Sequence, residues 1–194
     1  EHVDLWLHGF ALITDDSSVV PLFHRGYKTL IAQAKRKASA FTDLDANLDV
    51  LAKQLRDHPA LVNAQFLPLY FSNWNELDAA LTLFVKSDGN PRAASNQQEV
   101  ATLQMLGGLF PYKEDRDFAR RMQSALHSEN EKFFHQWWVA ETRRREHAIE
   151  TADSLWQKVH RPQLQNFLNH TQQSNGEVWL ALSLQGEGRT VNGG

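Results

Sequence analysis

The sequence contains no cysteine, and this absence excludes several kinds of chemistry at once. None of the 194 residues is Cys. The chain therefore has no disulfide bonds, no thiol nucleophile and no thiolate ligand for a metal ion.

The sequence also has little net charge and no long apolar run. Its formal net charge is −3, with 20 basic and 23 acidic side chains, so there is no basic field for nucleic acid. No segment approaches the roughly 18 consecutive apolar residues of a membrane-spanning helix. We therefore predict no nucleic-acid partner and no membrane span, and the sequence does not indicate an oligomeric state.

The first residue is Glu1 rather than methionine. This start fits either a trimmed expression product or a chain from which a signal peptide has been removed. We expect a secreted or periplasmic protein, with a cytoplasmic location as the alternative.

What is present is mainly helical in pattern. The clearest segment lies between a cap at Thr42 or Asp43 and a stop at Pro59. Its apolar stripe consists of Leu44, Leu48, Leu51 and Leu55. Similar patterns predict helices from about Pro21 onward and within residues 72–89 and 95–111. Four successive helices indicate a helical domain. Residues 1–13 fit neither the helical nor the strand period and stay unassigned.

Residues 113–160 contain no proline and no glycine. Nearly fifty such residues predict either one very long helix or a helix that is broken into two. Its aromatic residues Phe134, Trp137 and Trp138 could form a platform for a ligand, although aromatic residues spaced along a helix are more often part of a core.

The end of the chain has strand character. In "EVWLALSLQ", apolar side chains alternate across both faces of residues 178–184, and "QGEG" can turn the chain into a second strand. We therefore predict a mainly α (α+β) fold with two parts. These are a helical domain over residues 1–172 and a C-terminal β-hairpin over 173–194, which could be the first edge of a larger sheet.

One group of side chains suggests a metal site. His127, Glu131 and His135 lie at i, i+4 and i+8, so they project from about one face of the long helix. Imidazole and carboxylate suit zinc, but the outer two residues would be about 12 Å apart at a rise of about 1.5 Å per residue. The residues more simply predict a surface pair of His127 with Glu131, and His135 packed beside Trp138.

The order of elements, helices followed by the strand "GEVWLALSLQ" and the turn "GEGR", resembles the front portion of bacterial zincin-like metallopeptidases. The resemblance covers mainly residues 162–194 and is one of pattern. It implies that an edge strand made of Val178, Trp179, Leu180, Ala181 and Leu182 binds an extended peptide substrate. It also implies a zinc-binding HExxH helix, which this sequence does not contain.

Two hypotheses follow for function. The first is the N-terminal part of an exported zinc metallopeptidase-like protein, with no catalytic residues and no cofactor in this chain and with zinc bound only by a longer natural protein. The second is a complete helical module that binds a protein or a ligand. The coding sequence after Gly194 distinguishes them, because only the first requires an HExxH motif there.

Overall fold

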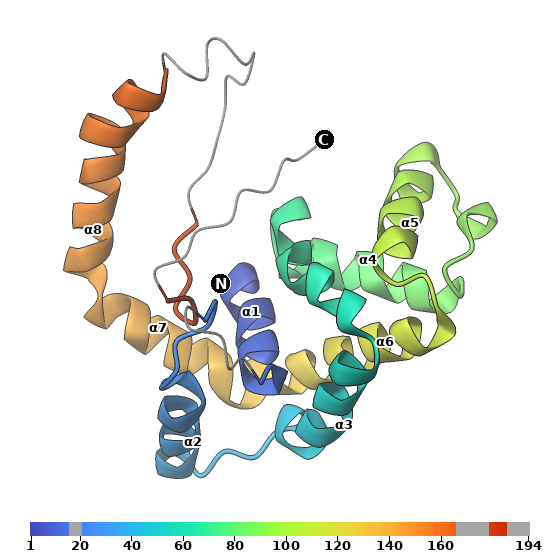
Figure 1. The fold of residues 1–194 in the computed structure, drawn as a ribbon, viewed down its shortest axis with the longest axis horizontal. Helices are drawn as coiled ribbons and strands as arrows, with labels where there is room; N and C mark the ends of the chain where they lie inside the picture. The colour runs from blue at the N-terminus through green and yellow to red at the C-terminus, as the bar shows by residue number, and fades with distance from the viewer. Residues whose placement is uncertain (16–20, 166–178, 186–194) are drawn as a thin grey trace. The chain divides into compact units, whose positions relative to one another are not determined.

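The structure is a computed structural model that describes residues 1–15, 21–165 and 179–185. Its α-helices are α1 (His2–Ile13), α2 (Tyr27–Ala38), α3 (Asp43–Asp57), α4 (Trp74–Lys86), α5 (Gln97–Leu109), α6 (Lys113–Glu129), α7 (His135–Arg144) and α8 (Glu146–Leu155). Shorter 3₁₀ or π segments are η1 (Pro59–Tyr70), η2 (Pro91–Ala93), η3 (Asn130–Phe134) and η4 (Trp156–His160). The helical part of the predicted fold is thus confirmed (Figure 1).

The chain divides into two compact units. Unit 1 contains Glu1–His135 together with the segment that begins at Ala181, and unit 2 contains Gln136–Leu180. The predicted domain boundary at residue 173 lies outside the described residues. The sites described below all belong to unit 1.

Helix α1 forms the centre of unit 1, where it contacts α2, α3, α6 and η1 (Figure 1). Every residue of this helix except Leu12 is buried. Trp6 and Phe10 have no exposed surface, and the Trp6 indole N–H donates to the Ala64 carbonyl at 2.9 Å. A helix buried on all sides has no polar face. The apolar period by which a surface helix is recognised is therefore missing from residues 1–13.

Helices α1 and α6 approach each other closely at Gly9. A Cβ atom at this position would lie 2.3 Å from Met122 Cε and 3.0 Å from Leu126 Cδ2. Both of these α6 side chains have no exposed surface. The absence of a side chain at Gly9 is what allows the two helices to pack at this distance.

The predicted cap at Thr42 is confirmed, and in the predicted stripe Leu44, Leu51 and Leu55 are buried whereas Leu48 is half-buried. Thr42 and Asp45 form a capping box at the start of α3, and Asn73 and Asn96 cap α4 and α5. The long run after residue 113 is broken rather than continuous. The π segment η3 interrupts it after Glu129, and a turn at Arg145 separates α7 from α8.

The predicted C-terminal β-hairpin is wrong for the residues that the structure describes. Residues 179–185 contain no strand, and their ladder pairing is limited to one isolated antiparallel bridge between Phe23 and Leu184. A strand needs a continuous partner backbone, and here the partner segment turns into α2 shortly after Phe23. The remaining hairpin residues lie outside the described part.

The prediction about membranes can be compared with the helices directly. Over the described ranges, none of the helices combines the length and the apolar character that crossing a membrane requires.

Candidate functional site

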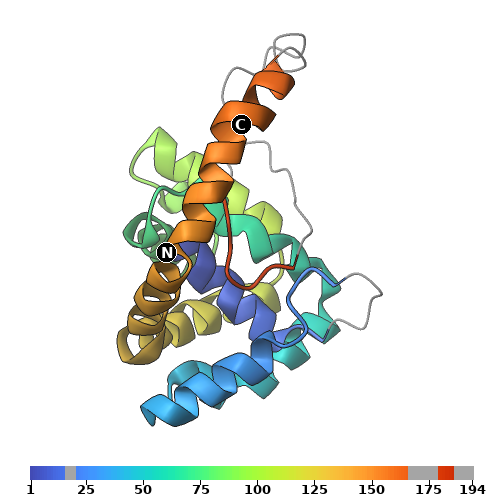
Figure 2. The ribbon, with the colours of Figure 1, turned by 90° about the vertical axis from the view of Figure 1, so that its left-hand side faces the viewer.

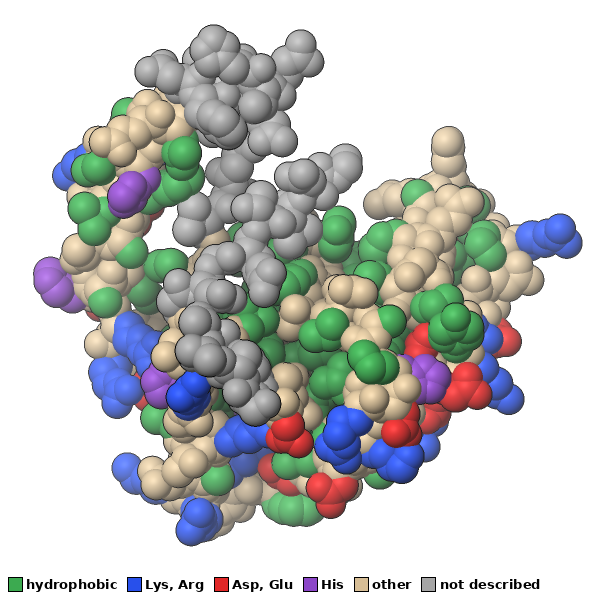
Figure 3. All heavy atoms as spheres, viewed as in Figure 1, with side chains coloured by type: hydrophobic (Ala, Val, Ile, Leu, Met, Phe, Trp, Pro, Cys, Tyr) green, Lys and Arg blue, Asp and Glu red, His purple; other side chains and the backbone are tan. Residues whose placement is uncertain are grey.

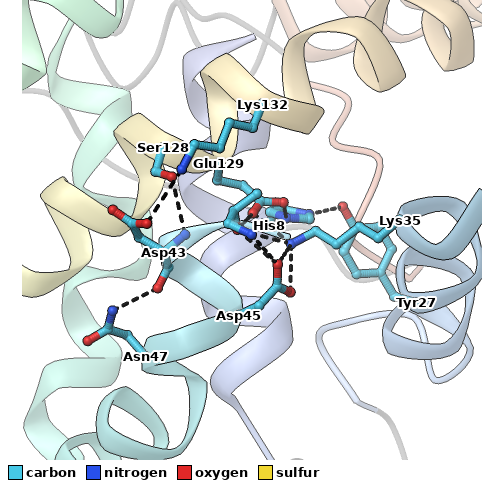
Figure 4. A network of polar contacts seen from close by, with 10 residues as sticks. His8, Tyr27, Lys35, Asp43, Asp45, Asn47, Ser128, Glu129 and Lys132 are labelled. Carbon is cyan, nitrogen blue, oxygen red and sulfur yellow. Dashed lines mark hydrogen bonds and ion pairs between the residues drawn. The ribbon is translucent and has the colours of Figure 1, made fainter. Parts of the chain in front are cut away.

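The carboxylate of Glu129, at the end of α6, has no exposed surface and lies within a network of polar side chains (Figure 4). Its Oε1 lies 3.0 Å from His8 Nε2, and its Oε2 accepts from Lys35 Nζ at 2.7 Å and from the Thr42 hydroxyl. Lys35 also donates to both carboxylate oxygens of Asp45 at 2.8 Å. The network therefore joins α1, α2, the start of α3 and α6 through side chains alone.

Local structure explains how these groups are positioned. Asp45 accepts from the Thr42 backbone N–H at 2.8 Å in the capping box, which fixes the Thr42 hydroxyl beside Glu129. Ser128, the neighbour of Glu129, accepts from the Asp43 N–H at 3.2 Å. The π segment η3 begins directly after Glu129, and such wider turns change the direction of the side chains that follow.

The protonation states of His8 and Glu129 can be assigned. Burial lowers the pKa of His8, and this outweighs the opposing effect of Glu129. Burial on its own would raise the pKa of Glu129, but His8 and Lys35 together lower it. His8 is therefore neutral and Glu129 ionised near neutral pH. An ionised carboxylate only accepts hydrogen bonds, so His8 carries its proton on Nε2, and Nδ1 accepts from the Tyr27 hydroxyl at 2.9 Å.

The network stabilises the fold and does not line either of the two surface cavities of unit 1 that are described. His8 and Glu129 have no exposed surface, and Phe134 packs on the His8 ring at 4.8 Å between centroids. Phe134 is thus a core residue and no platform for a ligand.

A cavity of about 500 Å³ lies between α3 and α6 and is the best candidate for a ligand site. His58 lines this cavity, and its Nδ1 lies 3.0 Å from the carboxylate of Asp115, a residue that is 3% exposed and lies behind the lining. Asp115 also accepts from the Tyr112 N–H at 3.1 Å, so its position is fixed by the first turn of α6. The imidazole at the edge of the cavity thus lies within ion-pair distance of a buried carboxylate oxygen, which has no hydrogen-bond partner among the described residues.

The other walls of this cavity carry charges of both signs. Arg116 pairs with Asp88 at 2.9 Å, and Arg120 pairs with Asp117 at 2.6 Å. Lys113 and Glu114 line the same cavity, and neither has an ion pair among the residues that the structure describes. Acidic and basic side chains intermingle over α3 and α6 in Figure 3.

The three predicted metal ligands have separate partners. His127 Nδ1 lies 3.8 Å from Asp78 and its ring packs near Trp74, whereas His135 Nδ1 lies 2.6 Å from Glu1. Glu131 is exposed within η3. Within the described ranges no group of three His, Asp or Glu residues is arranged to hold a metal ion.

The predicted peptide-binding edge strand is wrong. Val178 lies outside the described residues, and the residues from Trp179 to Leu182 are not in a strand. They therefore offer no free sheet edge to a substrate. The Leu182 N–H is instead used within unit 1, where it donates to Asp4 at 2.7 Å.

Sequence analysis did not identify His8, Glu129, Asp115 or His58 as parts of polar pairs. The partners in the His8–Glu129 pair are 121 residues apart, and those in the His58–Asp115 pair are 57 apart by their numbers. The only local sequence signal for these polar groups was the predicted N-cap at Thr42. No family model, curated protein or solved structure matches the chain, so the site is argued from its geometry alone.

Proposed function

We propose that the chain acts as a helical binding module, and that its ligand site is the cavity between α3 and α6. The observation that carries this proposal is His58 on the cavity wall, with the carboxylate of the buried Asp115 3.0 Å from its Nδ1. An imidazole held beside a buried carboxylate is directed, which is typical of sites that bind a polar ligand group. With Nδ1 beside Asp115, Nε2 is the ring nitrogen that a ligand can meet.

The ligand proposed is a small molecule with an anionic group, such as a carboxylate or a phosphate. Arg116 and Arg120 are already paired with acidic side chains. Lys113 has its charge available to the cavity and can take the anionic group. His58 would then bind a neighbouring polar group of the same ligand, because histidine can accept or donate at Nε2.

Calorimetric titration with inorganic phosphate and with small mono- and dicarboxylates tests this proposal. We expect at least one of these probes to bind, and His58→Ala or Lys113→Met to weaken it about tenfold, as loss of a charge-assisted hydrogen bond does. The matched control is His147→Ala, because His147 is exposed in unit 2. Failure of all probes to bind, or equal affinity in all variants, would contradict the proposal.

The metallopeptidase hypothesis stays a prediction. It has lost the edge strand on which the peptide was to bind, because residues 179–185 are not in a strand. Zinc bound by a longer natural chain and export from the cell belong to this hypothesis. It requires an HExxH motif downstream of Gly194, and reading the coding sequence there decides it.

A further inference from the structure

The lining of the cavity between α3 and α6 carries more than one positive charge for an anion. The two helices pack against each other within unit 1 (Figures 1 and 2). Besides His58, the charged lining residues are four acids and three bases, namely Asp57, Asp88, Glu114 and Asp117 with Lys113, Arg116 and Arg120. A ligand that is only an anion would meet more negative than positive side chains, and like charges brought together cost binding free energy.

Most of these charges are already neutralised by a neighbour. Asp57 pairs with Lys53, Asp88 with Arg116, and Asp117 with Arg120 and Arg121. Lys113 and Glu114 are left without such a partner within the part of the chain that the structure describes. They are consecutive residues in the first turn of α6, so their side chains point about 100° apart and do not face each other. One positive and one negative charge on the same wall are therefore both open to a ligand.

The cavity also has an apolar part. Leu61 from η1 is 1% exposed, Val85 from α4 is half-buried, and both line the cavity. The volume of about 500 Å³ is within the range of roughly 300–1,000 Å³ that is typical of small-molecule sites. It exceeds what a carboxylate and an ammonium group alone would fill. A ligand that matches this lining combines both charges with an apolar group.

We propose that the ligand of this cavity is a zwitterionic amino acid with an aliphatic side chain. Lys113 binds its carboxylate, Glu114 binds its ammonium group, and Leu61 and Val85 contact its side chain. The inference rests on the proposed function, because it names the class of ligand for the same site. A simple carboxylate or a simple amine meets only one of the two open charges and is repelled by the other.

The test is an NMR titration of the isotope-labelled full chain with matched probes. These are leucine, isocaproate, which is leucine without its amino group, and isoamylamine, which is leucine without its carboxylate. Glycine is the probe without the aliphatic side chain. The variants are Glu114→Gln and Lys113→Met, which change exposed side chains and should keep the fold. Glu146→Gln is the matched control, because Glu146 is an exposed acid in the first turn of α8.

We expect leucine to bind at least about fivefold more tightly than isocaproate, isoamylamine or glycine, as one further charge pair or apolar contact at an open site allows. Glu114→Gln should weaken leucine about fivefold but leave isocaproate unchanged or tighter, because the acid attracts the ammonium group and repels a plain anion. Lys113→Met should weaken leucine and isocaproate alike. Glu146→Gln should change neither, and the shifted resonances should include residues 113–117.

The result that overturns this inference differs from the one that overturns the proposed function. If isocaproate binds as tightly as leucine, or if Glu114→Gln weakens both to the same extent, the ligand is a plain anion and only the inference fails. Glycine binding as tightly as leucine would also overturn it, since the apolar wall then has no part in recognition. If leucine, isocaproate and inorganic phosphate all fail to bind, the proposed function fails with it.

Discussion

His8 donates from Nε2 to the Glu129 carboxylate across 3.0 Å, and neither side chain has any exposed surface. This contact joins the central helix α1 to the end of α6. Because the carboxylate also holds Lys35 and Thr42, one buried group connects side chains from four parts of unit 1. Buried charges are costly unless they are paired, so the network should control how stability responds to pH and to substitution.

The first prediction is that the protein loses stability as the pH falls below about 6.5. Burial lowers the pKa of His8 from its ordinary value of 6.5, so the unfolded chain binds this proton at a higher pH than the folded chain does. Stability is therefore complete above 6.5 and falls as the pH decreases towards the folded pKa, by up to about 1.4 kcal/mol per pH unit. Glu129, whose pKa is also lowered, adds a second loss below its ordinary value of 4.5.

Urea unfolding at pH 7.5, 6.5 and 5.5 measures this effect. In His8→Asn the titrating group is absent, so the change in unfolding free energy between pH 7.5 and 5.5 should be smaller than in the wild type. His147→Asn is the matched control, because this histidine is exposed. An equal pH response in His8→Asn and in the wild type would assign the acid sensitivity to other groups.

The second prediction concerns Lys35, whose side chain is 7% exposed and reaches both Glu129 and Asp45. Lys35→Met should destabilise the fold by about 3–5 kcal/mol, because it leaves buried negative charge without its cation. Lys37→Met on the same helix should change stability by less than about 0.5 kcal/mol, since Lys37 is exposed.

A double substitution separates lost pairing from lost packing. If the cost of Lys35→Met arises from the unpaired charge, then Lys35→Met combined with Glu129→Met should cost less than the sum of the two single changes. Chemical denaturation of the wild type, the two single variants and the double variant measures the coupling free energy between Lys35 and Glu129. Strict additivity would show that the lysine acts through its hydrocarbon chain.

Sequence reasoning succeeded where one face of a helix is buried. The stripe of Leu44, Leu51 and Leu55 has almost no exposed surface, and its period and its cap at Thr42 are both visible in the sequence. It failed at α1, because the helix is buried all round and its polar residues His2, Asp4 and His8 are buried too, so they mark no solvent-exposed face. It also failed at the C-terminal segment, where the alternation of apolar residues predicted a strand but residues 179–185 make only one isolated bridge.

The candidate sites depend on contacts that no local pattern contains. Asp115 lies in the first turn of α6, where it accepts from the N–H of the N-cap residue Tyr112, but its pairing with His58 depends on how α3 and α6 pack. In the sequence, Glu129 looks like one more charged surface residue of "HSENEK". The preceding Phe118, Met122, Ala125 and Leu126 lie on the buried face of α6, and extending this face to Glu129 would have predicted a buried acid.

The third prediction compares two glycines in helices. Gly9→Ala should destabilise the fold by about 1–3 kcal/mol, because the new Cβ would lie 2.3 Å from the enclosed Met122 side chain. Gly107→Ala in α5 should stabilise it by about 0.5–1 kcal/mol, because nothing lies within 4 Å and alanine favours a helix. Thermal and urea unfolding of both variants measures the difference. A gain at both positions would show that α1 and α6 are packed less closely than the structure indicates.

The fourth prediction compares two buried serines, of which only Ser128 has a hydrogen bond to its hydroxyl. Ser183 is 1% exposed, and its hydroxyl has no hydrogen-bond partner among the described residues, so burying it costs free energy. Ser183→Ala keeps the backbone contacts to residues 22–25 and should stabilise the protein by about 1 kcal/mol. Ser128→Ala should give no gain, because the Ser128 hydroxyl accepts from the Asp43 N–H at 3.2 Å and its loss offsets the better helix propensity of alanine. Urea unfolding of both variants and the wild type at one pH measures these changes in the free energy of unfolding. If Ser183→Ala is less stable than the wild type, the hydroxyl has a partner and the segment is held more specifically than by its backbone and by Asp4.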